Sequence, residues 1–124
     1  MCGIFGLISV SGRPLDLTIL AKITSVLQHR GPDDSGYWIF SRAALGHTRL
    51  AIIDLDTGAQ PITDEQVRAI VFNGEIYNYR ELRNDLINRE SRFGTVSDTE
   101  VIFEAYKELL LHKQRQKLVF RSAL

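Results

Sequence analysis

The only cysteine of this 124-residue chain is Cys2, directly after the initiator methionine. Because cysteine is small, Met1 is expected to be removed, which would leave Cys2 with a free α-amino group beside its thiol. An α-amino group has a pKa of about 7.7 to 8.0, so near neutral pH it can accept the thiol proton directly or through water. Cys2 could then act as an N-terminal nucleophile. The alternative is an inert cysteine buried in a first strand.

Further positions suited to acyl-transfer chemistry occur where predicted strands or helices begin or end. Arg49 interrupts an apolar strand with a guanidinium that fits a carboxylate, although an exposed strand edge would also suit it. Asn73 and Gly74 could donate a side-chain amide and a backbone N–H to an oxyanion, or could form a turn. Asp98 could bind a cation or stabilise a helix dipole, and Glu75 could be a ligand or a solvated charge.

Other polar residues do not predict a metal or nucleotide site. His29, His47 and His112 lack metal-ligand spacing with one another and with Cys2, so no zinc or iron site is predicted. The adjacent carboxylates at 33–34 lie in a Gly/Pro-containing stretch and are typical of a turn. Nothing matches a Walker or dinucleotide-binding pattern.

Hydrophobic periodicity and turn residues indicate the elements that must position these groups. β-type patterns predict strands over residues 2–9, 37–40, 43–53, 67–72 and 93–96. Helical spacing predicts helices over residues 15–29, from Asn78 through Ile87, and from Ser97 to about Leu111. The stretch 30–36 is expected to be a loop and 54–61 a turn. Ser97 and Glu100 have the spacing of a capping box.

The composition is that of an ordinary globular domain. Hydrophobic residues make up 44% and charged residues 24%, and the formal net charge is zero, so neither nucleic-acid nor membrane binding is predicted. A single cysteine cannot form an internal disulfide, and the apolar stretch at 4–10 is too short to span a membrane. A cytoplasmic location is therefore expected. We predict one domain over residues 2–112 and a divergent basic tail over residues 113–124.

Six short motifs occur in one order along the chain. They are Met-Cys-Gly-Ile-Phe-Gly at 1–6, His-Arg-Gly-Pro-Asp-Asp-Ser-Gly at 29–36, Leu-Gly-His-Thr-Arg-Leu at 45–50, Gly-Ala-Gln-Pro at 58–61, Asn-Gly-Glu-Ile-Tyr-Asn at 73–78 and Ser-Asp-Thr-Glu at 97–100. Together they resemble the glutamine-hydrolysing domain of class II amidotransferases, over residues 2 to about 106. The second and fifth motifs resemble the asparagine synthetase family more than the other members of that class.

The resemblance implies an α+β N-terminal-nucleophile hydrolase fold, an αββα sandwich of two antiparallel sheets, incomplete at the C-terminal end. It also implies hydrolysis of glutamine to glutamate and ammonia through a γ-glutamyl thioester on Cys2. Asn73 and Gly74 would hold the oxyanion. The residues implied to bind glutamine are Arg49 for its α-carboxylate, Glu75 and Asp98 for its α-ammonium, and Leu50, Ile52 and Ile53 for further contacts.

The resemblance ends before the later strands and the ATP-using synthetase domain of the family, so the chain is expected to be truncated and to expose apolar faces. No cofactor is expected in this chain, because ATP and Mg²⁺ would belong to the missing synthetase domain. Glutamine is the expected small-molecule partner, and a homodimer or association with a synthetase domain are both left open. The alternative function is that of a catalytically inactive remnant acting as an interaction or regulatory protein.

Overall fold

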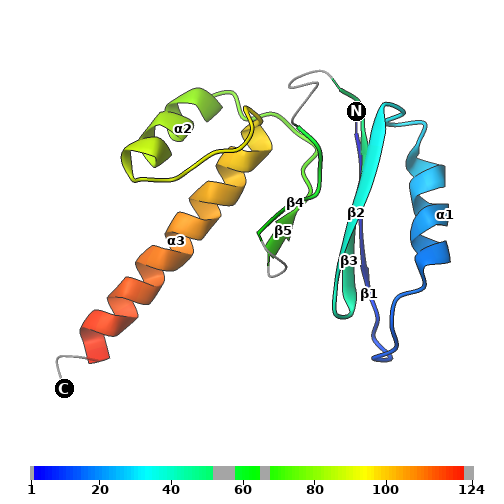
Figure 1. Ribbon diagram of the computed structural model, residues 1–124, viewed down its shortest axis with the longest axis horizontal. Helices are drawn as coiled ribbons and strands as arrows, with labels where there is room; N and C mark the ends of the chain where they lie inside the picture. The colour runs from blue at the N-terminus through cyan, green and yellow to red at the C-terminus, as the bar shows by residue number, and fades with distance from the viewer. Residues whose placement is uncertain (1, 52–57, 65–67, 122–124) are drawn as a thin grey trace.

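The computed structural model describes residues 2–51, 58–64 and 68–121, which form an α+β structure with two antiparallel sheets (Figure 1). In chain order, the elements are β1 (Gly3–Ile8), α1 (Leu17–Leu27), β2 (Asp34–Phe40), β3 (Ala43–Arg49), β4 (Ile62–Asp64), β5 (Arg68–Ile70), α2 (Tyr79–Asn88) and α3 (Asp98–Arg121). The predicted α+β class is therefore confirmed. The two-sheet αββα sandwich in its complete form stays a prediction.

The first sheet has the strand order β1-β3-β2, so the strand that ends at Arg49 lies in its centre. Gly3 pairs with Thr48 in the antiparallel register. The Thr48 hydroxyl accepts a hydrogen bond from Gly3 N at 3.2 Å and donates one to Leu27 O at 3.1 Å. Because Leu27 is the last residue of α1, this hydroxyl ties the helix to two strands and anchors the start of β1.

The second sheet is the hairpin β4–β5, in which Ile62 pairs with Ile70. In Figure 1 this hairpin lies on one side of the first sheet and α1 on the other. The two sheets approach closely at Gly36, where a Cβ atom would lie 2.6 Å from the carbonyl oxygen of Gln60. A residue with a side chain would therefore force the hairpin away from the first sheet.

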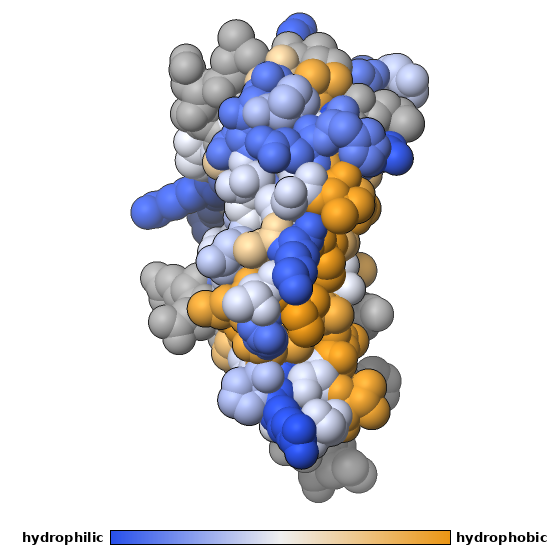
Figure 2. All heavy atoms as spheres, turned by 90° about the vertical axis from the view of Figure 1, so that its right-hand side faces the viewer, coloured by the Kyte–Doolittle hydropathy of each residue, from blue (hydrophilic) through white to orange (hydrophobic). Residues whose placement is uncertain are grey.

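The helices cover the sheets incompletely. Among the residues whose burial the structure describes, the buried apolar side chains are few, namely Leu20, Ala44, Leu86, Val101 and Phe103. Figure 2 shows apolar side chains gathered over the face that carries α1, where the exposed apolar residues of the helix include Leu17 and Val26. The expectation of exposed apolar surface is confirmed.

Several strand predictions need correction. Residues 34–36 were expected in a loop, but β2 begins at Asp34 because that residue already pairs with Arg49. β4 was not predicted, since three residues are too few for a period to be recognised. The predicted strand at 93–96 is wrong: the backbone amides of Gly94 and Thr95 donate to the carboxylate of Glu100, at 2.8 and 2.7 Å, instead of to a neighbouring strand.

The start of α3 uses half of the predicted capping box. Ser97 Oγ accepts from Thr99 N at 3.1 Å, as an N-cap should. Glu100 binds the preceding loop and thereby fixes the entry to the helix. The helix continues to Arg121 and not only to Leu111 as predicted, so the proposed domain boundary at residue 112 falls inside α3 and stays a prediction.

Candidate active site

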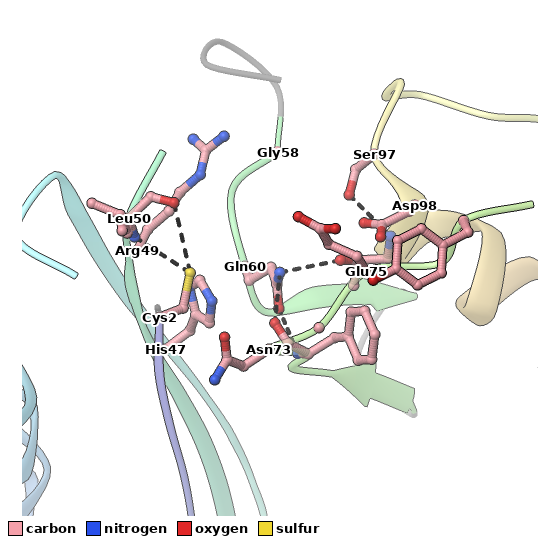
Figure 3. A pocket seen from close by; sticks show the side chains of 14 residues that line it. Cys2, His47, Arg49, Leu50, Gly58, Gln60, Asn73, Glu75, Ser97 and Asp98 are labelled. Atoms are coloured by element: carbon pink, nitrogen blue, oxygen red, sulfur yellow. Dashed lines mark hydrogen bonds between the residues drawn. The ribbon is translucent and has the colours of Figure 1, made fainter. Parts of the chain in front are cut away.

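One cavity of about 360 Å³ brings together seven residues that the sequence indicated and that the structure describes. They are Cys2, Arg49, Leu50, Asn73, Gly74, Glu75 and Asp98. The other two predicted substrate contacts, Ile52 and Ile53, lie outside the described residues. Figure 3 shows that the cavity has two sides. We call them the sheet wall, formed by Cys2, His47, Arg49 and Leu50, and the loop wall, formed by residues 73–75 and Asp98.

The Cys2 thiol is held at the edge of the sheet wall. Leu50 N donates a hydrogen bond to Cys2 Sγ at 3.3 Å, and the thiol can donate to Leu50 O at 3.7 Å. Arg30 Nε donates to the carbonyl oxygen of Cys2 at 3.3 Å. Since Cys2 precedes β1 and Leu50 follows β3, the antiparallel pairing of these strands places the thiol beside the arginine at the end of β3.

The loop between α1 and β2 supports the end of β3. Asp33 N donates to Arg49 O at 3.0 Å, and Ala51 N donates to Asp33 Oδ2 at 2.8 Å. Gly31 lies against the same strand, because a Cβ atom there would lie 2.5 Å from the carbonyl carbon of Arg49. Asp33 was interpreted as a turn residue, but its backbone N–H and its carboxylate together also fix the backbone on the two sides of Leu50.

The loop wall begins at Asn73, which two residues separate from the end of β5. In Figure 3 the Asn73 side-chain amide extends from this wall towards Cys2 on the opposite side. The next two residues, Gly74 and Glu75, are exposed to the cavity. A Cβ atom on Gly74 would lie 2.7 Å from the ring of Phe72, so this backbone passes too close to the aromatic ring for a larger residue.

Asp98 joins the loop wall to α3. It is the first residue of the helix, and its Oδ2 accepts a hydrogen bond from Ile76 N at 3.0 Å. A carboxylate at this end is also favoured by the helix dipole. Both interpretations of Asp98 from the sequence are thus compatible with its position, because this residue of the first helical turn lines the same cavity as Cys2.

Gln60 is a cavity residue that reasoning from the sequence missed. Its Oε1 accepts from Phe72 N at 2.6 Å, and its Nε2 donates to Phe72 O and to Thr99 Oγ1, both at 3.2 Å. These partners are 12 and 39 residues away, so no local pattern predicts them. The signal available was the Gly-Ala-Gln-Pro motif, which was recognised without a role for its glutamine.

His47 gives the sheet wall a buried imidazole. Its side chain is 1% exposed, and its Nε2 has no hydrogen-bond partner within the described part of the chain. Burial lowers the pKa of His47, and the positive charge of Arg49 lowers it further, whereas Asp34 acts in the opposite direction. The imidazole is therefore neutral at neutral pH.

The cavity combines groups suited to one kind of chemistry. A thiol on one side faces an amide and a backbone N–H on the other, which can stabilise the oxyanion formed when a thiolate adds to a carbonyl group. Among the residues that the structure describes, no cluster of three or more His, Cys, Asp or Glu side chains could hold a metal ion. None of the described helices has both the length and the apolar character needed to cross a membrane.

Comparisons with known proteins show the family of the chain. A family model described as "Glutamine amidotransferase domain" matches residues 1–118. Asparagine synthetase (glutamine-hydrolyzing) 1 of Bacillus subtilis (strain 168) is 38% identical over 97% of this chain. Asparagine synthetase B of Escherichia coli (strain K12) and asparagine synthetase 2 of Oryza sativa subsp. japonica are each 40% identical over 87% of it. The chain spans only 20%, 20% and 18% of these three relatives.

Proposed function

The chain belongs to the glutamine amidotransferase domain family, and we propose that it hydrolyses glutamine to glutamate and ammonia as the glutaminase part of an asparagine-synthetase-like enzyme. The observation that carries the proposal is the shared cavity of Cys2, Arg49, Asn73 and Asp98, four residues from widely separated parts of the chain. Each supplies a different group that glutamine hydrolysis needs.

Cys2 is the proposed nucleophile, acting with its own α-amine once Met1 has been removed. The amine accepts the thiol proton, and the thiolate attacks the side-chain amide carbon of glutamine. The resulting tetrahedral intermediate breaks its C–N bond as the ammonium returns the proton to the leaving nitrogen, so ammonia departs and a γ-glutamyl thioester remains. Water then attacks the thioester carbon, which releases glutamate and restores the thiol.

Asn73 and Gly74 are the proposed oxyanion donors. The Asn73 side-chain amide extends across the cavity towards Cys2 (Figure 3), and Gly74 places a backbone N–H on the same wall. Each well-placed donor of this kind contributes about 3 to 4 kcal/mol to transition-state stabilisation. Because both precede α2 in one short segment, a single displacement of that segment would weaken both.

The charged residues of the cavity fit the two charges of an amino acid. Arg49, which is 7% exposed, is the proposed partner of the α-carboxylate. Glu75 and Asp98 on the loop wall are the proposed partners of the α-ammonium. Leu50 would contact the substrate from the sheet wall, and Ile52 and Ile53 stay proposed contacts. One cation and two anions around a zwitterion select free glutamine over an uncharged amide.

The activity of the whole protein is also a proposal, because the chain spans about a fifth of its curated relatives. The relatives' names point to asparagine synthesis, for which the ammonia would pass to an ATP- and Mg²⁺-dependent synthetase domain. We further propose that the two sheets belong to an αββα N-terminal-nucleophile sandwich, that the protein acts in the cytoplasm, and that it associates with a synthetase domain or with a second copy of itself.

A Cys2→Ala variant tests the proposed function. It is expected to lower glutamate release by about 10³-fold or more, because the nucleophile is absent. It should still bind glutamine, and glutamine at 100 times its Kd should stabilise it by about 2.7 kcal/mol, measured by thermal denaturation. Intact mass must first establish that Met1 has been removed. Glutamate release that survives in Cys2→Ala would refute the nucleophile assignment.

The wild-type protein decides between enzyme and inactive remnant. If it begins at Cys2, yet releases no glutamate and is not stabilised by glutamine, the glutaminase proposal is wrong. The alternative of an interaction or regulatory protein then takes its place.

A further inference from the structure

We infer that Gln60 is a positioning residue that holds the Asn73–Gly74 segment at the distance from Cys2 that the reaction requires. The inference rests on the proposed function, because it assigns Gln60 a role through the oxyanion donors. Gln60 lines the cavity, and Figure 3 shows its amide lying between the sheet wall and the loop wall, bonded towards the latter. Three contacts support this role.

The first contact is with the residue that precedes Asn73. Gln60 Oε1 accepts from Phe72 N at 2.6 Å, and Gln60 Nε2 donates to Phe72 O at 3.2 Å. The side-chain amide therefore binds both backbone polar groups of Phe72, as a neighbouring β-strand would. Asn73 and Gly74 follow Phe72 directly. Fixing both backbone groups of Phe72 therefore fixes the direction in which the Asn73–Gly74 segment leaves the hairpin.

The pairing of β4 and β5 explains why a side chain takes this part. Ile62 pairs with Ile70, so extending the same register by two residues places Gln60 opposite Phe72. Pro61 has no backbone N–H and cannot continue a ladder of hydrogen bonds. At this position, where the regular pairing of the hairpin has ended, the side-chain amide of Gln60 bonds the backbone of the residue opposite.

The second and third contacts connect Gln60 to the other parts of the cavity. Gln60 Nε2 also donates to Thr99 Oγ1 at 3.2 Å, beside Asp98 in the first turn of α3. The backbone of Gln60 lies against the first sheet, since a Cβ atom on Gly36 would be 2.6 Å from its carbonyl oxygen. The first sheet, the segment that leads to Asn73 and Gly74, and the start of α3 thus meet at one residue.

Few other side chains could make these bonds. Glutamate keeps the acceptor for Phe72 N but has no donor for Phe72 O, asparagine is one methylene shorter, and methionine has a similar length with neither polar group. We call the hydrogen bonds of the Gln60 side chain to Phe72 and Thr99 the clamp. Gln60→Met therefore removes the clamp while nearly keeping the side-chain volume. The matched control is Gln28→Met, at the exposed residue that caps the C-terminal end of α1 and does not line the cavity, where the glutamine side chain makes no hydrogen bond that the structure shows.

Amide hydrogen exchange of Phe72 tests the clamp without any requirement for activity. In the full chain, measured by NMR, Phe72 N–H should exchange about tenfold faster in Gln60→Met than in the wild type, because it loses its acceptor. In Gln28→Met and in Gln60→Glu the exchange should stay within about twofold of the wild type, since both keep that acceptor. Unchanged exchange in Gln60→Met overturns the inference.

Kinetics test what the clamp does for the reaction. Gln60→Met should lower kcat about 10²-fold, because a misplacement of about 1 Å has an effect of that order. The KM for glutamine should stay within about threefold, since the oxyanion donors act mainly in the transition state. Alkylation of Cys2 by iodoacetamide should be unaffected, because the thiol lies on the sheet wall. If Gln60→Met does not fold, Gln60→Leu carries the same kinetic test, because leucine also lacks both polar groups.

The outcomes separate this inference from the proposed function. A wild type that releases no glutamate refutes the function, while the exchange of Phe72 still decides whether Gln60 is the clamp. A Gln60→Met variant that exchanges faster at Phe72 but keeps kcat within about threefold of the wild type overturns the positioning role. Equal losses of kcat and of iodoacetamide reactivity also overturn it, because they indicate a general loss of structure.

Discussion

The substitution Gly31→Ala should displace the backbone that supports Arg49 without changing any side chain proposed to contact glutamine. Gly31 is buried, and the Cβ atom that alanine adds would lie against the carbonyl oxygen of Thr48 and 2.5 Å from the carbonyl carbon of Arg49. Both contacts are with backbone atoms, so no side-chain rotation can relieve them. The loop or the end of β3 must move by about half an ångström or more, because close-packed interiors leave no spare room.

The size of the effect follows from that movement. Forcing one extra methyl group into a packed region costs about 1 to 3 kcal/mol, which for a chain of this length lowers Tm by roughly 4 to 12 °C. The displaced strand end carries Arg49, the proposed carboxylate ligand, so the KM for glutamine should rise by about tenfold or more. The kcat should fall less, because binding of the carboxylate contributes equally to the ground state and the transition state.

Thermal denaturation and glutamate release at varied glutamine concentration measure both quantities. The matched control is Gly6→Ala in β1, where the added Cβ atom meets only ordinary contacts at 3.6 and 3.9 Å, so Tm and KM should stay close to the wild-type values. If Gly31→Ala leaves Tm within about 1 °C and KM unchanged, the supporting role of the loop is wrong. A lower Tm with an unchanged KM would confine that role to stability.

Substitutions at two neighbouring residues of β3 provide further tests. Thr48→Val leaves Gly3 N and Leu27 O without their hydroxyl partner and should reduce the free energy of unfolding by about 1 to 3 kcal/mol in urea denaturation. Thr48→Ser keeps the hydroxyl and should reduce that free energy less. Equal reductions in the two variants would contradict the role given to the Thr48 hydroxyl. His47 has a folded-state pKa below its ordinary value of 6.5, so its contribution to stability is complete above that pH and is lost as the pH falls through the lowered pKa. His47→Gln should therefore show a smaller decrease in Tm between pH 8 and about pH 5.5 than the wild type, and parallel curves would show that His47 does not titrate on unfolding.

Local patterns were sufficient for the larger elements of the fold. The helix over Leu17–Leu27 and the strands β1 and β3 were predicted because their apolar residues repeat over enough positions to define a period. Short strands were both missed and wrongly predicted. β4 has only three residues and was missed, whereas the predicted strand at 93–96 has strand-like residues whose amides bind Glu100. In the first case the strand is too short to define a period, and in the second a carboxylate five and six residues further along the chain binds the amides.

The residues of the candidate site also fall into those that the sequence indicates and those that it does not. Residues with distinctive chemistry, such as Cys2 and Arg49, could be selected from the sequence because their types and positions are unusual. Gln60, Arg30 and His47 were not selected for the site, because a glutamine, arginine or histidine on a loop or strand is ordinary until its partners are known. Their partners lie 12 to 39 residues away for Gln60 and 28 residues away for Arg30.

The sequence by itself determined the chemical groups of the proposed reaction, because a second-position cysteine and the motifs that follow depend only on residue identity and order. Only the tertiary structure decided that Cys2, Arg49, Asn73 and Asp98 line one cavity, and that Gln60 connects Phe72 to the first turn of α3. The physical reason is that strand pairing and side-chain clamps join distant residues through backbone groups, which every residue type carries and which leave no mark on local sequence.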